Sequence, residues 1–263
     1  MITVCSMNRR DHLLRQLDGV RRWLPGAVHH TVQIGRTGFP VEGSAVVDRT
    51  GPGEVNLSAA RNAGADAAVR AGAKRLIFLD ADCIPGPDLG RFYDLAVREH
   101  PGAVVCGPVT YLPEPAAHAG PVELSELAGL TAPHPARPDP PAGEFRPATA
   151  DEYELFWSLS FAVSADLWAG LRRNTGGFCE QYTGYGGEDT DFAMLLRKEC
   201  IPMLWAGGAH AYHQWHPVSS PPVEHVAAVL RNAALFHQRW GWWPMRGWLE
   251  AFAEQGLIRW PPQ

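Results

Sequence analysis

The sequence predicts an α/β protein with a doubly wound, mostly parallel central sheet, and two observations lead to this fold class. Short apolar segments alternate with helical segments over about a hundred residues, which is the pattern of parallel strands joined by helices. The segment "KRLIFLD" at 74–80 contains an uninterrupted apolar run, as expected for a strand that is covered on both faces. In such a sheet, ligands bind beyond the carboxyl ends of the strands.

The elements of the first half follow in order along the chain. Residues 1–7 predict a buried strand, and residues 9–24 predict a helix because leucine and valine recur there at helical spacing. Further strands are expected at 29–35, 44–48, 74–80 and 102–109, and further helices at 56–73 and 86–100. The Ala-rich helix at 56–73 closes at Gly72, a typical C-terminal signal.

A proline-rich segment at 111–150 interrupts this alternation, and a loop of that length is typical of a functional segment. It separates residues 1–110 from residues 151–263 within what we expect to be a single domain, 1–263. After it, the sequence predicts a strand at 156–164, a helix at 165–173, a glycine-rich turn leading into a helix within 174–199, an extended segment at 201–217 and a helix at 224–243.

Charge and cysteine content narrow the class of partner and the compartment. The 28 acidic residues outnumber the 23 basic ones, and no block of Lys and Arg is present, so we expect no nucleic-acid partner. The five cysteines are scattered without a CxxC spacing, which favours reduced thiols. Because no apolar run approaches the roughly 18 residues of a membrane span and no secretory signal is present, we expect a soluble cytoplasmic protein.

Two aspartates follow the apolar run of the strand at 74–80. Asp80 and Asp82, in "FLDADC", can present two hard oxygen ligands to one divalent cation at the end of a strand. Mg²⁺ and Mn²⁺ favour carboxylates combined with substrate phosphate oxygens. The alternative is a pair that caps a loop or a helix, and the two aspartates alone do not separate these readings.

A second acidic group lies at the start of the helix within 174–199. The stretch "GYGGEDTDF" brings Glu188, Asp189 and Asp191 together behind glycines that allow a close backbone approach to a ligand. Acidic residues also suit the positive end of a helix, but capping needs one acid rather than three. A carboxylate held in such a turn can act as a general base toward an acceptor hydroxyl.

Three histidines lie three residues apart in "HAYHQWHP". Glycines before them and Pro217 after them favour an extended segment, in which His210 and His216 share a face and His213 points the other way. Together with the two aspartates, they indicate at least one histidine metal ligand, and the spacing leaves open which one.

In combination these motifs resemble nucleotide-sugar-dependent glycosyltransferases of the GT-A fold, in the broad family 2 group. The carboxyl half also resembles the galactosyltransferase and N-acetylgalactosaminyltransferase branch. The similar stretches occur in the same order as in the family and are "VCSMNRRDHLLRQL", "LSAARNAGADAA", "FLDADC", "FAVSADLW", "GGFCEQYTGYGGEDTDF" and "YHQWHP". The most specific of them is the glycine-rich "GGF…GYGGEDTD" element downstream of "FLDAD".

The resemblance implies a cofactor, a donor and roles for the residues. Mn²⁺ or Mg²⁺ would be held by Asp82, with Asp80 contacting the metal or the ribose, and by His213 or, second, His216. Asp189 would be the general base of an inverting transfer of a hexose or N-acetylhexosamine from a UDP-sugar to an acceptor hydroxyl. A metal-dependent hydrolase and a non-catalytic sugar- or nucleotide-binding protein are the alternatives.

The resemblance also assigns binding residues. Those expected at the nucleotide are Asn8, Arg9, Asp48, Arg61, Asn62 and Asp80, although Asn8, Arg9 and Asn62 also suit helix capping and Arg61 also suits a surface position. Those expected at the donor sugar or the acceptor are Tyr185, Gly187, Glu188, Asp191 and Trp215, with bracing of the turn as the alternative for Glu188 and Asp191.

The chain departs from the family at three places. The acidic pair that usually contacts the base after the second strand is absent, and Gln33 and Arg36 stand there, so we expect Asp48 to replace it. Cys179 stands where the family often has Asp, and Tyr185 where it usually has Trp. The first change bears on the base, and the other two bear on the choice of sugar or acceptor.

Overall fold

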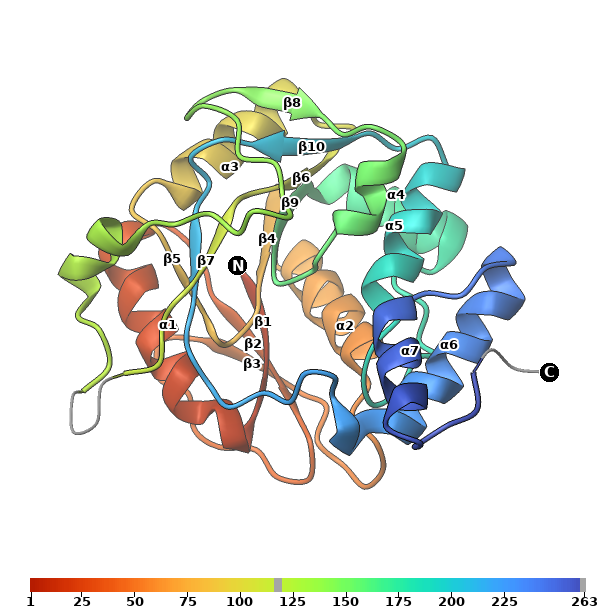
Figure 1. Ribbon diagram of the computed structural model, residues 1–263. Coiled ribbons are helices and arrows are strands. Elements are labelled where there is room, and N and C mark those ends of the chain that lie inside the picture. Colours follow the sequence, from red (N-terminus) through yellow and green to blue (C-terminus); the bar gives the residue numbers. More distant parts are fainter. Residues whose placement is uncertain (116–119, 261–263) are drawn as a thin grey trace.

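An eight-stranded mixed sheet forms the centre of the structure, a computed structural model that describes residues 1–115 and 120–260 (Figure 1). In spatial order its strands are β3 (Ala45–Asp48), β2 (His30–Ile34), β1 (Ile2–Ser6), β4 (Arg75–Leu79), β9 (Ser160–Ser164), β6 (Val104–Cys106), β10 (Met203–Ala206) and β8 (Phe145–Pro147). Strands β1 to β4 are mutually parallel, as the sequence predicts. The α/β class with a mostly parallel sheet is therefore confirmed.

Two strands run against the others. β9 pairs antiparallel with both β4 and β6, and β8 pairs antiparallel with β10. The chain reaches β9 from the proline-rich segment rather than through a crossover helix, so it enters the sheet at the edge where β4 ends. Leu79, the last residue of β4, lies opposite Ser160, the first residue of β9. Residues just before β9 therefore lie at the same end of the sheet as residues just after β4.

Helices cover both faces of the sheet (Figure 1). One face carries α2 (Leu57–Arg70), α4 (Ala165–Thr175) and α5 (Glu188–Lys198), and the other carries α1 (Arg10–Trp23) and α3 (Leu89–Glu99). Neighbouring residues of β4 show the division, because Phe78 packs in the first core and Leu79 in the second. The ring of Phe78 stacks on that of Phe161, with centroids 4.3 Å apart.

The remaining elements are a second, smaller sheet, four short 3-10 helices and the last two helices of the described chain. A second, three-stranded sheet has the order β5 (Cys83–Pro85), β11 (Ala211–His213) and β7 (Val109–Tyr111). The 3-10 helices are η1 (Met7–Arg9), η2 (Leu124–Leu130), η3 (Asp151–Leu155) and η4 (Val223–His225), and the chain closes with α6 (Val226–Trp240) and α7 (Arg246–Glu254). No helix in residues 1–115 and 120–260 has both the length and the apolar character needed to cross a membrane.

The proline-rich segment has more regular structure than the sequence predicts. It contains η2 and β8, and it begins with the last residue of β7. β8 adds to the edge of the large sheet by pairing with β10. Prolines remove backbone donors, which confines a proline-rich strand to a sheet edge.

Helix α2 approaches the sheet closely because its inner face carries small residues. A methyl group added at Gly64 would lie 2.5 Å from Val32 Cγ2 and 2.7 Å from Ile2 Cγ2, well inside ordinary contact distance. Ala60, Ala65 and Ala68 line the rest of this face in the core. The Ala- and Gly-rich composition of the helix thus sets how near its residues come to the ends of β1 and β4.

We expect Gly64→Ala to lower the free energy of unfolding by about 1–3 kcal/mol, because the added methyl must push α2 away from β1 and β2. Urea unfolding measures the change. Gly170→Ala is the matched control: it lies within α4 with no atom within 4 Å of the added carbon, so it should stabilise by about 0.5–1 kcal/mol. Equal effects of the two substitutions would contradict the close packing of α2 on β1 and β2.

Candidate functional site

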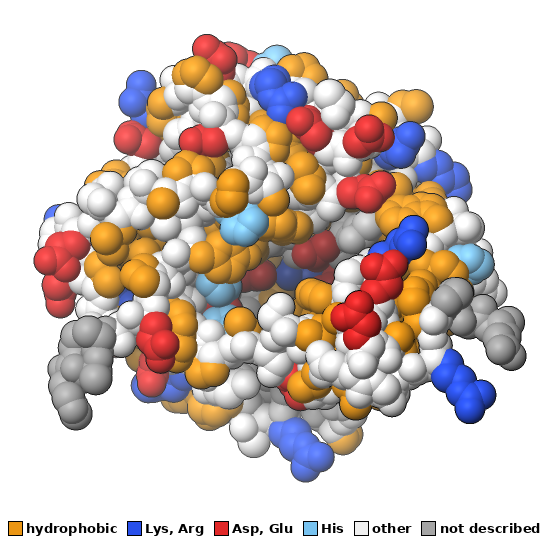
Figure 2. All heavy atoms as spheres, viewed as in Figure 1, with side chains coloured by type: hydrophobic (Ala, Val, Ile, Leu, Met, Phe, Trp, Pro, Cys, Tyr) orange, Lys and Arg blue, Asp and Glu red, His pale blue; other side chains and the backbone are white. Residues whose placement is uncertain are grey.

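A polar site lies at the end of the sheet where the parallel strands β1 and β4 finish. The chain leaves β1 toward Arg9 and leaves β4 toward Asp80, and Ser158 precedes β9 at the same edge. The backbone N–H of Asp80 donates to the carbonyl of Leu159 at 2.9 Å, which joins two of these segments. Figure 2 shows a hollow in the molecule with acidic, basic and histidine side chains gathered in and around it.

Asp82, His213 and His216 form a group that could hold a metal ion. Their candidate ligand atoms all lie within 4.8 Å of one another. The Nε2 atoms of His213 and His216 lie 3.6 Å and 3.5 Å from the two carboxylate oxygens of Asp82. One carboxylate and two imidazoles suit Mn²⁺ and other first-row divalent ions better than Mg²⁺, which prefers oxygen ligands.

The small sheet brings these residues together. β11 pairs antiparallel with β5 so that His213 lies opposite Cys83, next to Asp82. The backbone N–H of Gln214 then donates to the carbonyl of Asp82 at 2.7 Å. β11 ends at His213 and the chain turns, which brings His216 back to the same carboxylate.

The expectation that His213 would point away from His216 is therefore wrong, because the segment is extended only up to His213. His210 lies elsewhere, with its Nε2 2.6 Å from Thr110 Oγ1. Burial lowers the pKa of His213, so its ring is neutral and able to bind a metal at neutral pH. Burial would raise the pKa of Asp82, but the polar side chains around it, including the guanidinium of Arg9, lower it to about 2.

Tyr111 supports one of these histidines, and the sequence analysis did not single it out. β7 pairs with β11 so that Tyr111 lies beside His213. The two rings stack with centroids 4.5 Å apart and an angle of 28° between their planes. Tyr111 is the first residue of the proline-rich segment, so this segment contributes to the position of a candidate metal ligand.

Asp80 points to Arg61 rather than into the three-residue metal group. Its carboxylate lies 3.2 Å from Arg61 Nη2. Nη1 of the same guanidinium lies 3.6 Å from Glu188 and 3.7 Å from Asp189. The side chain of Arg61 is 4% exposed, so the structure replaces the surface alternative for this residue with a buried cation among three carboxylates.

Burial and the neighbouring charges shift the pKa values of Arg61 and of the carboxylates around it. Burial alone would lower the pKa of Arg61, but Asp80, Asp189 and Glu188 raise it above its usual range. Burial raises the pKa of Asp80 to about 6 against the effect of Arg61. Burial and the neighbouring Asp189 raise the pKa of Glu188 to about 7. One cation does not compensate three carboxylates, so Glu188 takes up a proton readily.

Asp189 is held in a fixed orientation by Ser158. The hydroxyl of Ser158 donates to one carboxylate oxygen at 2.6 Å, and its backbone N–H donates to the other at 3.1 Å. Gly186 and Gly187 before the helix have φ values of 85° and 93°, which glycine adopts without strain. Sequence reasoning missed Ser158, although polar residues at 158 and 160 in an otherwise apolar strand were a signal of a special environment.

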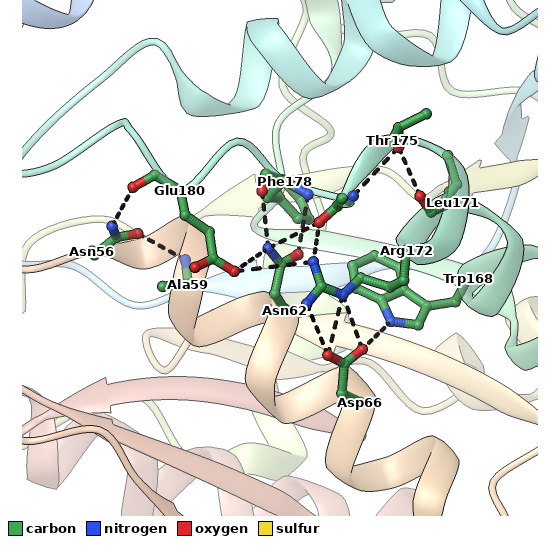
Figure 3. Close-up of polar contacts among 12 residues, drawn as sticks. Asn56, Ala59, Asn62, Asp66, Trp168, Leu171, Arg172, Thr175, Phe178 and Glu180 are labelled. Carbon is green, nitrogen blue, oxygen red and sulfur yellow. Dashed lines mark hydrogen bonds and ion pairs between the residues drawn. The ribbon is translucent and has the colours of Figure 1, made fainter.

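Asn62 lies in the core, and the expectation that it faces the nucleotide does not agree with its contacts. Its amide donates to the carbonyl of Phe178 and to the Glu180 carboxylate, both at 2.9 Å, and its oxygen accepts from the N–H of Phe178 at 3.0 Å (Figure 3). Beside it, Asp66 and Arg172 join α2 to α4 through an ion pair of 3.0 Å. Asn62 therefore holds the "GGF" turn onto α2.

Asp191 also serves the structure rather than an open surface. It has no exposed area. Its carboxylate accepts hydrogen bonds from Tyr182 at 3.0 Å, Arg239 at 2.6 Å and Trp240 at 2.7 Å. These contacts match the bracing alternative and not substrate binding, because three side chains of the protein already occupy the buried carboxylate.

The remaining predicted residues are Asp48, Asn8, Tyr185 and Trp215. Asp48 ends β3 and accepts hydrogen bonds from Thr50 at 2.9 Å and 2.7 Å, with no contact to the residues at Arg61. Asn8 lies in η1 and accepts a hydrogen bond from Ser6. Tyr185 and Trp215 are each 38% exposed. The ring of Tyr185 stacks on that of His225, with centroids 4.6 Å apart.

Several solved structures resemble this chain in fold. No protein-family model and no curated protein matches the sequence. Among solved structures, GalNAc-T7 with UDP, GalNAc and Mn²⁺ is similar over 99% of this chain and 57% of that chain, with a TM-score of 0.55 and 14% identity. The chain has the GT-A glycosyltransferase fold. The resemblance drawn from the motifs is thereby confirmed at the level of the fold.

A second similar protein is TarS from S. aureus. Its residues 1–349 in complex with UDP-GlcNAc are similar over 89% of this chain and 65% of that chain, with a TM-score of 0.56 and 13% identity. The chain thus spans about three fifths of the length of these GT-A structures. Identities of this size establish the fold alone, and the reaction has to be argued from the residues of the site.

The raised pKa of Glu188 predicts a pH-dependent effect on stability. Between about pH 4.5 and pH 7 the folded protein keeps a proton that the unfolded chain releases, so this group favours folding at low pH and loses that effect as the pH rises through 7. The free energy of unfolding of Glu188→Gln, measured relative to the wild type, should therefore be higher at pH 8 than at pH 5, by on the order of 1–3 kcal/mol.

Urea unfolding of metal-free protein at the two pH values measures this gain. The control is Glu250→Gln in α7, where the glutamate is 49% exposed and lies 3.1 Å from Arg246. Its difference from the wild type should be similar at both pH values. A Glu188→Gln difference that is also independent of pH would contradict the charge arrangement around Arg61.

Proposed function

We propose that the protein is a metal-dependent inverting glycosyltransferase that moves a hexose or N-acetylhexosamine from a UDP-sugar to an acceptor hydroxyl. The observation that carries the proposal is the pairing of two groups at one edge of a GT-A sheet. Asp82, His213 and His216 form a candidate metal site, and Asp189 is a carboxylate fixed in orientation by Ser158. GalNAc-T7 with UDP and Mn²⁺, and TarS with UDP-GlcNAc, share the fold.

The donor set fits a divalent cation. Asp82 is ionised at neutral pH and burial keeps His213 neutral, so both are in the protonation state that coordination requires. A cation held by Asp82, His213 and His216 would neutralise the diphosphate of the donor as the bond to the sugar breaks. Asp80 would lie beside this site, paired with Arg61, and could reach the ribose.

Asp189 is the residue best placed to act as a general base. Ser158 holds both carboxylate oxygens, so the carboxylate does not have to be ordered when the acceptor arrives. Asp189 would take the proton of the acceptor hydroxyl while that oxygen bonds to the anomeric carbon and UDP leaves. Glu188, beside Arg61, would contact hydroxyl groups of the sugar or the acceptor.

Two other functions use the same residues and differ in what they consume. A metal-dependent nucleotide-sugar hydrolase would consume the donor equally well with no acceptor present. A sugar- or nucleotide-binding protein without turnover would keep all its measurable behaviour when Asp189 is changed. The orientation of Asp189 by Ser158 favours an enzyme over a binding protein, because turnover and not binding needs a fixed general base.

A thermal-shift panel of nucleotide sugars, with and without Mn²⁺, identifies the donor. We expect one UDP-sugar to raise the melting temperature only when the metal is present, because binding to the folded state alone stabilises it. Stabilisation by nucleotide sugars with a base other than uracil would contradict the proposed donor. Equal stabilisation without metal would contradict the proposed cofactor.

Substitution then separates binding from transfer. Asp82→Ala should abolish Mn²⁺-dependent UDP binding in calorimetry, because it removes the only carboxylate of the three-residue group. Asp189→Asn should keep UDP affinity within about twofold and reduce transfer by about 100-fold or more, as expected for loss of a general base. If Asp189→Asn transferred sugar at the wild-type rate, the proposed mechanism would fail.

Ser158→Ala should slow transfer by about tenfold or more, because Asp189 loses the hydroxyl that fixes its orientation. UDP release from the identified donor measures this. Ser160→Ala is the control, because Ser160 bonds to Tyr93 and not to Asp189, and it should leave the rate within about twofold of the wild type.

A further inference from the structure

Arg9 contacts two of the three residues of the candidate metal group. It ends η1, directly after β1. Its Nη2 lies 3.2 Å from Nε2 of His216, and its Nε lies 3.9 Å from the Asp82 carboxylate. The side chain is 31% exposed, so it is partly open to solvent instead of being enclosed in the core.

The other nitrogen of His216 defines what Arg9 binds. Nδ1 of His216 lies 3.1 Å from the carbonyl oxygen of Pro217. A carbonyl only accepts hydrogen bonds and a guanidinium only donates them, so these two contacts together place the ring proton on Nδ1 and the lone pair on Nε2. Arg9 donates to this lone pair. A metal ion bound by His216 needs the same lone pair, so the guanidinium and the metal exclude each other there.

We propose that Arg9 is a built-in competitor of the metal, which leaves Asp82 and His216 when the metal binds and pairs instead with the diphosphate of the donor. This inference rests on the proposed function, because it needs a metal and a diphosphate at this edge. A divalent cation on Asp82 repels the guanidinium and removes both of its partners at once. The diphosphate supplies the anion that replaces them, and Arg guanidinium groups bind phosphate oxygens well.

Neighbouring cations do not share this arrangement in the part of the chain that the structure describes. Arg61 is held by Asp80, Glu188 and Asp189, none of which belongs to the three-residue metal group. Arg15 donates to the carbonyl of Val122 and, at 3.4 Å, to Gln214. Arg9 is therefore the arginine whose contacts the metal would take over.

The exchange makes the binding of metal and donor mutually dependent. Without a donor, the metal must displace Arg9 and leave it with no anion, which weakens metal binding. With a donor, the displaced guanidinium regains a charged partner. Because such coupling is reciprocal, the metal raises the affinity for the donor and the donor raises the affinity for the metal.

Arg9→Gln should therefore have opposite effects on the two ligands. Calorimetric titration with Mn²⁺ alone should show about threefold to tenfold tighter binding, because the competing charge is gone. Titration with UDP in saturating Mn²⁺ should show about tenfold weaker binding, because a charged hydrogen bond to phosphate is lost. Arg9→Lys keeps the charge and should lie between the wild type and Arg9→Gln in both titrations.

Arg10→Gln is the matched control. Arg10 is the next residue, it is 48% exposed, and it lies 3.7 Å from Asp11. Both affinities should stay at the wild-type values in this variant. Equal melting temperatures of the metal-free proteins show that the Arg9 variants are folded.

Unchanged or weaker Mn²⁺ binding by Arg9→Gln overturns the proposal, even if UDP binding falls, because a simple phosphate contact would give that result. Unchanged UDP affinity overturns it as well, because the exchange then lacks its second partner. The proposed function fails by a different result, namely Mn²⁺-dependent UDP binding that survives Asp82→Ala. Tighter Mn²⁺ binding combined with weaker UDP binding supports the exchange.

Discussion

The buried guanidinium of Arg61 is the contact on which the geometry of the site depends. It joins α2 to the end of β4 through Asp80 and to the start of α5 through Glu188 and Asp189. Carboxylates brought this close in a desolvated hollow repel one another, and a cation fixed among them reduces that repulsion. The close approach of α2 to the sheet, which Gly64 permits, places Arg61 where it can do this.

The candidate metal group depends on a separate structure, the three-stranded sheet. Pairing of β5 with β11 brings together residues more than a hundred positions apart in the sequence. Pairing of β7 with β11 adds Tyr111 to the ring of His213. The two aspartates of "FLDADC" therefore belong to different groups, Asp80 to the cation from α2 and Asp82 to the histidines. The site therefore has two charge centres that are held by different parts of the fold, one by α2 and one by the three-stranded sheet.

Much of the fold and part of the site could be predicted from the sequence. Apolar periodicity located most strands and helices, because burial on one or both faces leaves a direct pattern in the residues. The direction of β9 could not be predicted, since it depends on where the proline-rich segment delivers the chain. Asn62 and Asp191 were expected to contact ligands because a motif shows only which residue types stand together in the sequence. Their actual partners, Phe178 for Asn62 and Arg239 for Asp191, come from distant segments that the motif does not contain.

Hydrogen bonds from two different segments hold the first turn of α5 in place. Asp189 is held by Ser158 on one side, and two residues later Asp191 is held by Arg239 and Trp240 of α6 on the other. The first turn of α5 is thus fixed from both sides, and little conformational entropy remains to be lost there if a ligand binds to it. Substitutions in α6 could therefore loosen or tighten the turn that carries Asp189 without changing Asp189 or Ser158.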